Sequence, residues 1–137
     1  MENEVAVIFA DGGSRGNPGP SGSGAVLQVD GKTVASLSKF IGTATNNVAE
    51  YTGLLLGLEK ARAMGFKRVE VKMDSELVVK QMTGQYKVKN ENLLPLFEKA
   101  ARLADTFADF QIVHVRRELN KEADKLANQA MDEATLT

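Results

Sequence analysis

The sequence lacks cysteine and tryptophan altogether, and it contains a single histidine among its 137 residues. A chain without cysteine can form neither a disulfide framework nor a thiolate zinc site, and its composition predicts the reducing cytoplasm as its compartment. No apolar run approaches the ~20 residues that are needed to cross a bilayer. The first residues, Met1-Glu2-Asn3-Glu4, are acidic and lack the basic-then-apolar order of a signal peptide. We therefore expect no association with a membrane.

The chain also lacks an excess of positive charge. Lys and Arg number 17 against 18 for Asp and Glu, and the sequence pI is about 5.9. Overall positive charge therefore cannot drive binding to a nucleic acid, which would require a local basic patch or metal ions that cover the acids. The length suits one domain with a core of its own. We expect a single domain over residues 1–137, and a monomer.

The apolar pattern predicts an alternation of strands and helices. Apolar runs and alternating patterns predict strands over 4–10, 24–29, 33–40, 67–73 and 110–115. Helical spacing predicts helices over 47–64, 75–81, 93–104 and 120–131. Asp30-Gly31 is a two-residue hairpin signal, Gly65 is placed to end the first helix, and Asn120 is expected to cap the last one. This order predicts an α/β fold in which helices pack against a mixed sheet.

Two acids stand at positions where burial is expected. Asp11 ends the first strand in phase with its apolar residues, although an Asp-Gly pair is also common in turns. Glu50 shares a helical stripe with Leu54 and Leu58, where an acid is uncommon unless it is paired. An acid in the first turn of a helix is also favoured by the helix dipole, which would not require that face.

Two further acids have equally ordinary explanations when each is taken alone. Asp74 ends the fourth predicted strand as Asp11 ends the first, but Asp-Ser also starts helices, so Asp74 could be an N-cap. Asp124 lies early in the last predicted helix, where the dipole tolerates any acid. The four acids indicate a functional site only when they are considered together.

The four acids together favour a metal site. If the strands over 4–10 and 67–73 are parallel neighbours, Asp11 and Asp74 lie at the edge where ligands bind in open α/β sheets. Two carboxylates ~5 Å apart repel each other by about 3 kcal/mol at an effective dielectric constant of 20. Four converging carboxylates need protons or hard cations, and ligand sets made only of oxygen suit Mg²⁺ or Mn²⁺. Two such ions ~4 Å apart promote in-line displacement at phosphorus.

Four segments resemble the motifs of type 1 ribonuclease H, in the order and rough spacing of that family. They are Phe9-Ala10-Asp11-Gly12-Gly13, Thr45-Asn46-Asn47-Val48-Ala49-Glu50, Met73-Asp74-Ser75 and Asn120-Lys121-Glu122-Ala123-Asp124. The resemblance implies a ribonuclease H-like fold, with a five-stranded mixed sheet whose first three strands are antiparallel and which is flanked by helices. It also implies one catalytic domain that cleaves the RNA strand of RNA–DNA hybrids endonucleolytically, leaving 5′-phosphate and 3′-hydroxyl ends.

The resemblance assigns the four acids to two Mg²⁺ ions, which Mn²⁺ could replace. Asp11 would bridge both ions, and Asp124 would complete the ion that activates the attacking water. Glu50 and Asp74 would hold the ion that faces the leaving 3′ oxygen.

The resemblance also implies a set of substrate contacts: Gly13, Asn17, Thr45, Asn46 and Asn47. The three asparagines match positions that contact 2′-hydroxyls or nearby sugar and base edges, and the 2′-hydroxyl is the group that distinguishes RNA from DNA. Thr45 matches a position that grips a phosphate of the DNA strand.

The chain departs from many bacterial members, which carry a basic, tryptophan-containing protrusion after the third acid. In its place the sequence has only the short basic stretch Tyr86-Lys87-Val88-Lys89-Asn90. The resemblance is therefore to a compact bacterial or archaeal form. Weaker binding of the hybrid is expected, because phosphate contacts supply most of the affinity for nucleic acids.

A second departure concerns a histidine that many members keep in a loop before the last acid. His114 matches that position when no gaps are allowed, but it lies within an alternating strand. A shorter loop brings Arg117 near the position instead. Arginine cannot act as a general base because its pKa lies above ~12, but it can neutralise charge at the scissile phosphate. We predict that Arg117, rather than His114, is the catalytic residue of this loop.

Two other functions remain open from the sequence. An exonuclease of the same superfold would carry Asp-x-Glu on its first strand, whereas Asp11 is followed by Gly12 and Gly13. A catalytically weak module that binds hybrids or double-stranded RNA would be expected to lack at least one acid, and all four are present.

Overall fold

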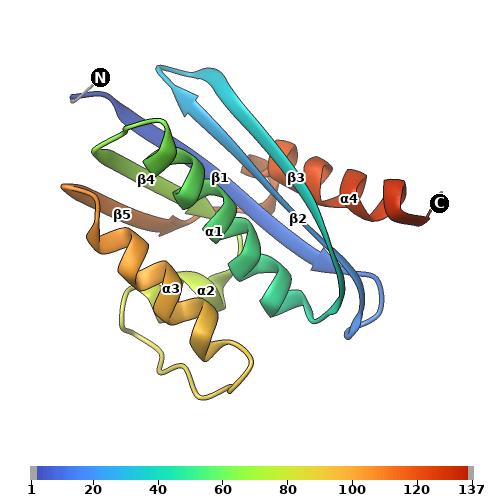
Figure 1. The fold of residues 1–137 in the computed structure, drawn as a ribbon. Helices are drawn as coiled ribbons and strands as arrows, with labels where there is room; N and C mark the ends of the chain where they lie inside the picture. The colour runs from blue at the N-terminus through green and yellow to red at the C-terminus, as the bar shows by residue number, and fades with distance from the viewer. Residues whose placement is uncertain (1–2, 136–137) are drawn as a thin grey trace.

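The computed structural model describes residues 3–135 as a five-stranded sheet with helices on both faces (Figure 1). The strands are β1 (Val5–Ser14), β2 (Gly19–Val29), β3 (Lys32–Ala44), β4 (Arg68–Met73) and β5 (Asp109–His114). The helices are α1 (Asn46–Ala63), α2 (Glu76–Met82), α3 (Leu94–Asp105) and α4 (Lys121–Thr135), and a short 3₁₀ turn, η1 (Arg117–Leu119), precedes α4. Among the described residues, none of these helices combines the length and the apolarity that a bilayer span requires.

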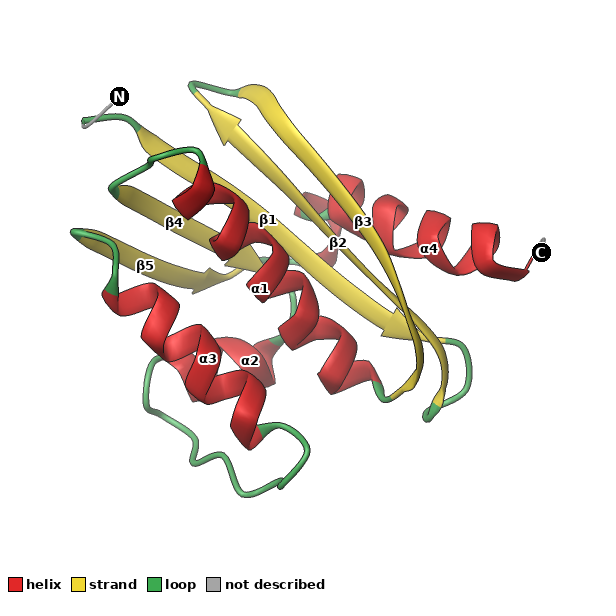
Figure 2. Ribbon diagram, in the orientation of Figure 1, coloured by secondary structure: helices red, strands yellow, loops and turns green. Residues whose placement is uncertain are grey.

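The sheet confirms the predicted fold class. Its strand order is β3-β2-β1-β4-β5 (Figure 2). β1, β2 and β3 pair antiparallel, whereas β4 pairs parallel with both β1 and β5. The carboxyl ends of β1 and β4 therefore lie at the same edge of the sheet, which fulfils the condition under which the sequence brings Asp11 and Asp74 together.

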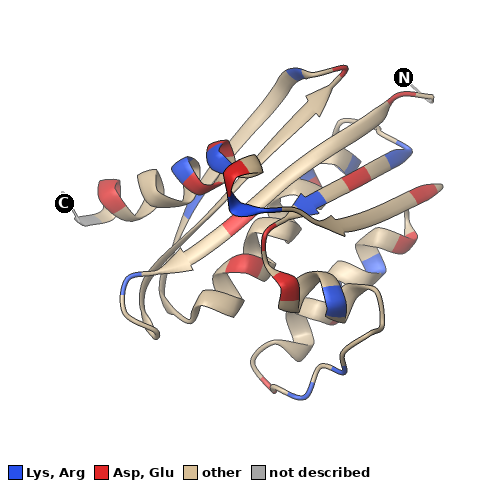
Figure 3. Ribbon diagram, turned by 180° about the vertical axis from the view of Figure 1, so that it is seen from behind, with Lys and Arg blue, Asp and Glu red and all other residues tan. Residues whose placement is uncertain are grey.

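The two faces of the sheet are covered differently. α1, α2 and α3 lie on one face, and α4 crosses the other face over β2, β1 and β3 (Figures 1 and 3). Leu54 and Leu58 of α1 are fully buried in the same apolar core as Ile8 of β1, which confirms the predicted apolar stripe of this helix. α4 can approach β2 closely because Gly22 and Gly24 lie beneath it, where a Cβ would overlap the backbone of the helix.

The strands at the amino-terminal end are longer than the sequence predicted. β1 continues past Asp11 to Ser14 because residues 12–14 pair with residues 21–23 of β2, and β2 begins at Gly19 because Gly19 and Pro20 pair with β3. The hairpin between β2 and β3 is as predicted. Asp30 and Gly31 have φ values of 51° and 77°, which a tight turn with positive φ at both central residues requires.

The residues at the helix ends test three of the sequence predictions. Gly65 follows α1 with a φ of 88°, which confirms it as the residue that ends this helix. Ser75, not Asp74, caps α2, because its Oγ accepts a hydrogen bond from the backbone N–H of Val78. Asn120 does precede α4, but the prediction that its side chain caps the helix is wrong. Its Oδ1 accepts no hydrogen bond, and its Nδ2 donates elsewhere, to Ala10 and Asp74.

Candidate active site

Asp11 and Asp74 come together because their strands are parallel neighbours. Asp11 lies within β1 with only 8% of its surface exposed, and Asp74 directly follows the last residue of β4. The register pairs Phe9 with Lys72, so both acids stand just beyond the paired segment, at the carboxyl ends of the two strands. This is the edge at which ligands bind in open α/β sheets.

Glu50 reaches this edge from α1, which lies against the backbone of β1. Gly12 and Gly53 make the close approach possible. A Cβ on Gly12 would overlap the carbonyl of Ala49, and a Cβ on Gly53 would overlap the carbonyl of Asp11. Glu50 therefore lies one residue from the point at which the helix and the strand touch.

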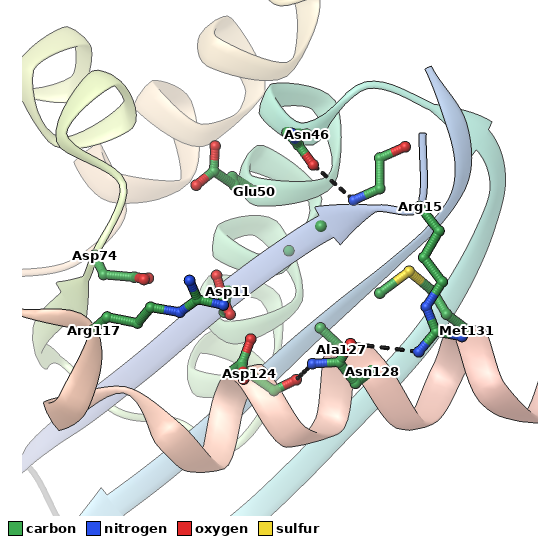
Figure 4. Close-up of a pocket in the computed structure, with 13 residues that line it drawn as sticks. Asp11, Arg15, Asn46, Glu50, Asp74, Arg117, Asp124, Ala127, Asn128 and Met131 are labelled. Carbon is green, nitrogen blue, oxygen red and sulfur yellow. Dashed lines mark hydrogen bonds between the residues drawn. The ribbon is translucent and has the colours of Figure 1, made fainter. Parts of the chain in front are cut away.

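Asp124 reaches the same edge from the opposite face of the sheet. It occupies the first turn of α4, and its backbone N–H donates a 3.1 Å hydrogen bond to the carbonyl of Asn120. Figure 4 shows the carboxylates of Asp11, Glu50, Asp74 and Asp124 around one opening, each contributed by a different segment of the chain.

The four acids line a pocket of about 380 Å³. Arg117 of η1 lines it too, and its side chain extends toward Asp11 and Asp74 (Figure 4). His114 lies at the end of β5 and is exposed. The other lining residues are Gly12, Gly13, Ser14, Arg15, Asn46, Ala127, Asn128 and Met131.

The crowding of the acids has an electrostatic cost. Burial raises the pKa of Asp11 to about 8, and the charge of Asp74 adds to this rise, while the backbone N–H of Gly12 opposes it. Burial raises the pKa of Glu50 to about 7. A hydrogen bond from Ser75 opposes that rise and the charge of Asp74 adds to it. Near neutral pH, Asp11 therefore favours its protonated form and Glu50 is partly protonated, unless a cation replaces the protons.

The donor atoms of the pocket suit a hard divalent cation. Carboxylate oxygens are the ligands that Mg²⁺ and Mn²⁺ prefer, and a cation would offset the burial and the repulsion that raise the pKa of Asp11 and Glu50. Within residues 3–135, no three acidic or histidine side chains already converge closely enough to enclose an ion. The chemistry of the donors fits such an ion, and ligation would require the carboxylates to move closer together.

The expected substrate residues gather beside the acids, where the turn after β1 meets the start of α1. Asn46 Oδ1 accepts a 2.7 Å hydrogen bond from the N–H of Ser14, and Asn17 Oδ1 accepts a 3.1 Å bond from the N–H of Asn46. Thr45 caps α1 by accepting a hydrogen bond from the N–H of Val48. Gly13 and Asn46 line the pocket itself, and Asn47 is half-buried in the first turn of α1.

The sequence did not reveal the far wall of the pocket. Asn128 and Met131 line it from α4, and Arg15 crosses to them from the turn after β1 (Figure 4). Asn128 is four residues beyond Asp124, so helical spacing could have placed it on the same face. The residues next to Arg15 in the sequence could not predict the position of its side chain, because its partner Asp132 lies far along the chain, in the last turns of α4.

Comparisons with known proteins identify the family of the chain. A family model described as "Reverse transcriptase-like" matches residues 9–130. The bifunctional protein Rv2228c of Mycobacterium tuberculosis is 54% identical over 130 residues, which are 93% of this chain and 36% of that protein. Ribonuclease HI of Halobacterium salinarum is 46% identical over 127 residues, 92% of this chain and 64% of that protein. The chain thus spans about a third of the length of the mycobacterial relative.

The solved structures are similar over nearly the whole chain. The N-terminal RNase H domain of Rv2228c has a TM-score of 0.94 and 48% identity, and the match covers 98% of each chain. The structure of LC11-RNase H1 in complex with an RNA/DNA hybrid has a TM-score of 0.89 and 45% identity, covering 95% of this chain and 99% of that one.

The family model and the fold place the chain in the class of reverse transcriptase-like domains. Within that class the relatives are hydrolytic nucleases. The chain belongs to the type 1 ribonuclease H family, and it resembles the compact bacterial and archaeal members.

Proposed function

We propose that this chain hydrolyses the RNA strand of RNA–DNA hybrids, as an endonuclease that leaves 5′-phosphate and 3′-hydroxyl ends. The observation that carries the proposal is the convergence of Asp11, Glu50, Asp74 and Asp124 on one pocket. Four acids contributed by four separate segments repel one another, and a structural role would not require that cost. The solved complex of a relative with an RNA/DNA hybrid supports the choice of substrate.

The four carboxylates would hold two Mg²⁺ ions, with Mn²⁺ as a substitute. Asp11 would bridge the two ions, because it is the most buried of the four and belongs to the central strand β1. Asp124 would complete the ion on the side of the attacking water, and Glu50 and Asp74 the ion on the side of the leaving oxygen. When bound, such ions supply a water nucleophile near neutral pH and neutralise charge on the phosphate.

The side chains around the acids would position the hybrid. Asn17, Asn46 and Asn47, with the backbone at Gly13, would contact the RNA strand and its 2′-hydroxyls. Thr45 would hold a phosphate of the DNA strand near the amino-terminal end of α1, where the helix dipole favours an anion. Arg117, which lines the pocket, would neutralise charge at the scissile phosphate.

Binding would be weaker than in relatives with a basic protrusion. The segment between α2 and α3 is a loop with few basic residues (Figure 3), and Tyr86 is its exposed aromatic side chain. Lys80 lies 5.0 Å from the centroid of the Tyr86 ring and also pairs with Glu76, so part of its charge is already compensated. We further propose that residues 1–137 act as one monomeric domain in the cytoplasm.

A cleavage assay with matched substrates tests the proposal. The purified chain is incubated with a labelled RNA–DNA hybrid, duplex RNA or duplex DNA, each in Mg²⁺, in Mn²⁺ or in a chelator. We expect internal cleavage of the RNA strand of the hybrid alone, and only with metal. Binding of the hybrid without cleavage in either metal would favour the alternative of a catalytically weak binding module, and trimming from one end would favour an exonuclease.

A further inference from the structure

One buried amide connects the segments that carry three of the four acids. Asn120 lies between η1 and α4 and is 1% exposed. Its Nδ2 donates a 2.9 Å hydrogen bond to the carbonyl oxygen of Ala10, the residue before Asp11. The same nitrogen donates a second 2.9 Å bond to Oδ1 of Asp74. Both hydrogens of the amide are therefore used in holding the site.

The backbone of Asn120 extends the connection. Its carbonyl accepts the 3.1 Å hydrogen bond from the N–H of Asp124, and its N–H donates a 3.0 Å bond to the carbonyl of Arg117. Asn120 thus contacts the backbone of two residues that line the pocket and the side chain of a third. These bonds connect the ends of β1 and β4 on one side with η1 and α4 on the other.

The orientation of the amide is fixed by its partners. If the amide were turned over, its oxygen would face the Ala10 carbonyl and the Asp74 carboxylate, which both accept hydrogen bonds. With the nitrogen toward them, Oδ1 is left buried without a hydrogen-bond partner. An unsatisfied buried oxygen is destabilising, so the fold keeps this arrangement at a cost in stability.

We propose that Asn120 is a positioning residue, which fixes the direction of the Asp74 carboxylate so that the four acids can bind divalent metal. The inference rests on the proposed function. A charge-assisted hydrogen bond from an amide to a carboxylate is directional, so it restricts how the Asp74 side chain can turn. Partners that orient metal-binding carboxylates in this way commonly change metal affinity when they are removed.

The alternative is that Asn120 only attaches α4 to the sheet, and a matched variant separates the two roles. In Asn120→Leu the side chain keeps a similar volume but donates nothing to Ala10 or Asp74. The control is Tyr51→Phe, which removes another buried hydrogen bond, the 2.6 Å bond from the Tyr51 hydroxyl to Gln81 Oε1. Tyr51 is also fully buried, and this bond contacts no carboxylate.

The first measurement is the rise in melting temperature that Mg²⁺ produces, which does not depend on turnover. We expect the Mg²⁺ concentration that produces a given rise to increase about tenfold or more in Asn120→Leu. It should stay within about twofold of the native value in Tyr51→Phe, even if both variants melt at equally lower temperatures. If Asn120→Leu does not fold, Asn120→Ala replaces it, because the smaller side chain cannot clash with its neighbours.

The second measurement is the cleavage of hybrid as a function of Mg²⁺. We expect Asn120→Leu to lose kcat at low Mg²⁺, to recover part of it at high Mg²⁺ and to keep the native KM for the hybrid. If an Asn120 variant is less stable but its melting temperature and its cleavage depend on Mg²⁺ as in the native chain, the role of Asn120 is purely structural. That result would overturn the inference. The native chain is measured first: if Mg²⁺ neither raises its melting temperature nor supports cleavage, the proposed function itself fails and this inference with it.

Discussion

Arg15 Nη2 lies 2.6 Å from Oδ1 of Asp132, so an ion pair joins the turn after β1 to the last turns of α4. The same nitrogen lies 3.5 Å from Oδ1 of Asn128, on the wall of the pocket. The side chains of the ion pair are 41% and 62% exposed, which places the pair in solvent. Arg15 lines the pocket, but the exposure of the ion pair limits what it can add to stability.

We predict that Arg15→Ala lowers the free energy of unfolding by less than about 1 kcal/mol, because exposed ion pairs are screened by water and salt. Denaturant unfolding of both proteins at low and high salt measures the difference, which should shrink as salt is added. A loss above about 2 kcal/mol that persists in salt would mean that the pair supports the packing of α4.

Asp11→Asn should abolish cleavage and leave the fold intact. The substitution removes the acid whose pKa burial and Asp74 raise to about 8, so it relieves repulsion while it removes the expected bridging ligand. We expect cleavage to fall about a thousandfold or more, and the melting temperature of the metal-free protein to stay equal or to rise. Asp105→Asn is the matched control, because Asp105 is exposed at the end of α3. Substantial cleavage by Asp11→Asn would rule out the proposed metal assignment.

The metal-free protein should lose stability as the pH rises. The pKa values of Asp11 and Glu50 rise from 3.8 and 4.5 to about 8 and about 7 on folding. The folded chain therefore binds more protons than the unfolded chain between about pH 4 and pH 8, and the free energy of unfolding falls through this window. Denaturant unfolding in a chelator at several pH values measures the fall.

Two changes should flatten that pH dependence. The double substitution Asp11→Asn and Glu50→Gln removes both titrating groups, and millimolar Mg²⁺ would replace the protons with a cation. If the double variant keeps the native slope, the pH dependence arises from other groups.

Arg117→Ala should lower turnover more than His114→Ala. Arg117 lines the acidic pocket, whereas His114 is exposed at the end of β5. At saturating hybrid we expect turnover to fall by roughly tenfold to a hundredfold for Arg117→Ala, and to change by less than about twofold for His114→Ala. Arg116→Ala is the control for charge, because the Arg116 side chain is 86% exposed and pairs only loosely, at 4.0 Å, with Glu118. A large loss in a folded His114→Ala, with Arg117→Ala near normal, would reverse the assignment.

Local signals in the sequence predicted the elements but not the extent of the strands around the site. The turn at Asp30-Gly31 and the end of α1 at Gly65 depend on positive φ, a property of single residues that can be seen in the sequence. The segments Gly12–Ser14 and Gly19–Gly24 are typical of loops in composition. They form strands because residues 12–14 pair with residues 21–23 and Gly19 pairs with β3, and the helices against them leave no room for a Cβ at Gly12, Gly22 and Gly24.

The site was predicted as a set of acids, while the contacts that organise it could not be predicted. The sequence predicted the convergence of Asp11 and Asp74 only if their two strands were parallel neighbours, and the structure shows that β1 and β4 are. Asn120 shows the limit of such reasoning. Its place before α4 suggested a cap, but its amide is turned toward Ala10 and Asp74 by the packing of α4 on the sheet.

The hydrogen bond between Asn120 and Ala10 joins residues 110 positions apart in the chain, and this separation has a consequence for biosynthesis. A ribosome releases the segments of β1, α1 and β4 before it releases α4, so the nascent chain exposes three of the acids before Asp124 can join them. Because α4 packs on β2, the pocket can be completed only after α4 has been synthesised. A polypeptide interrupted ahead of residue 120 would carry most of the acids and still lack the pocket.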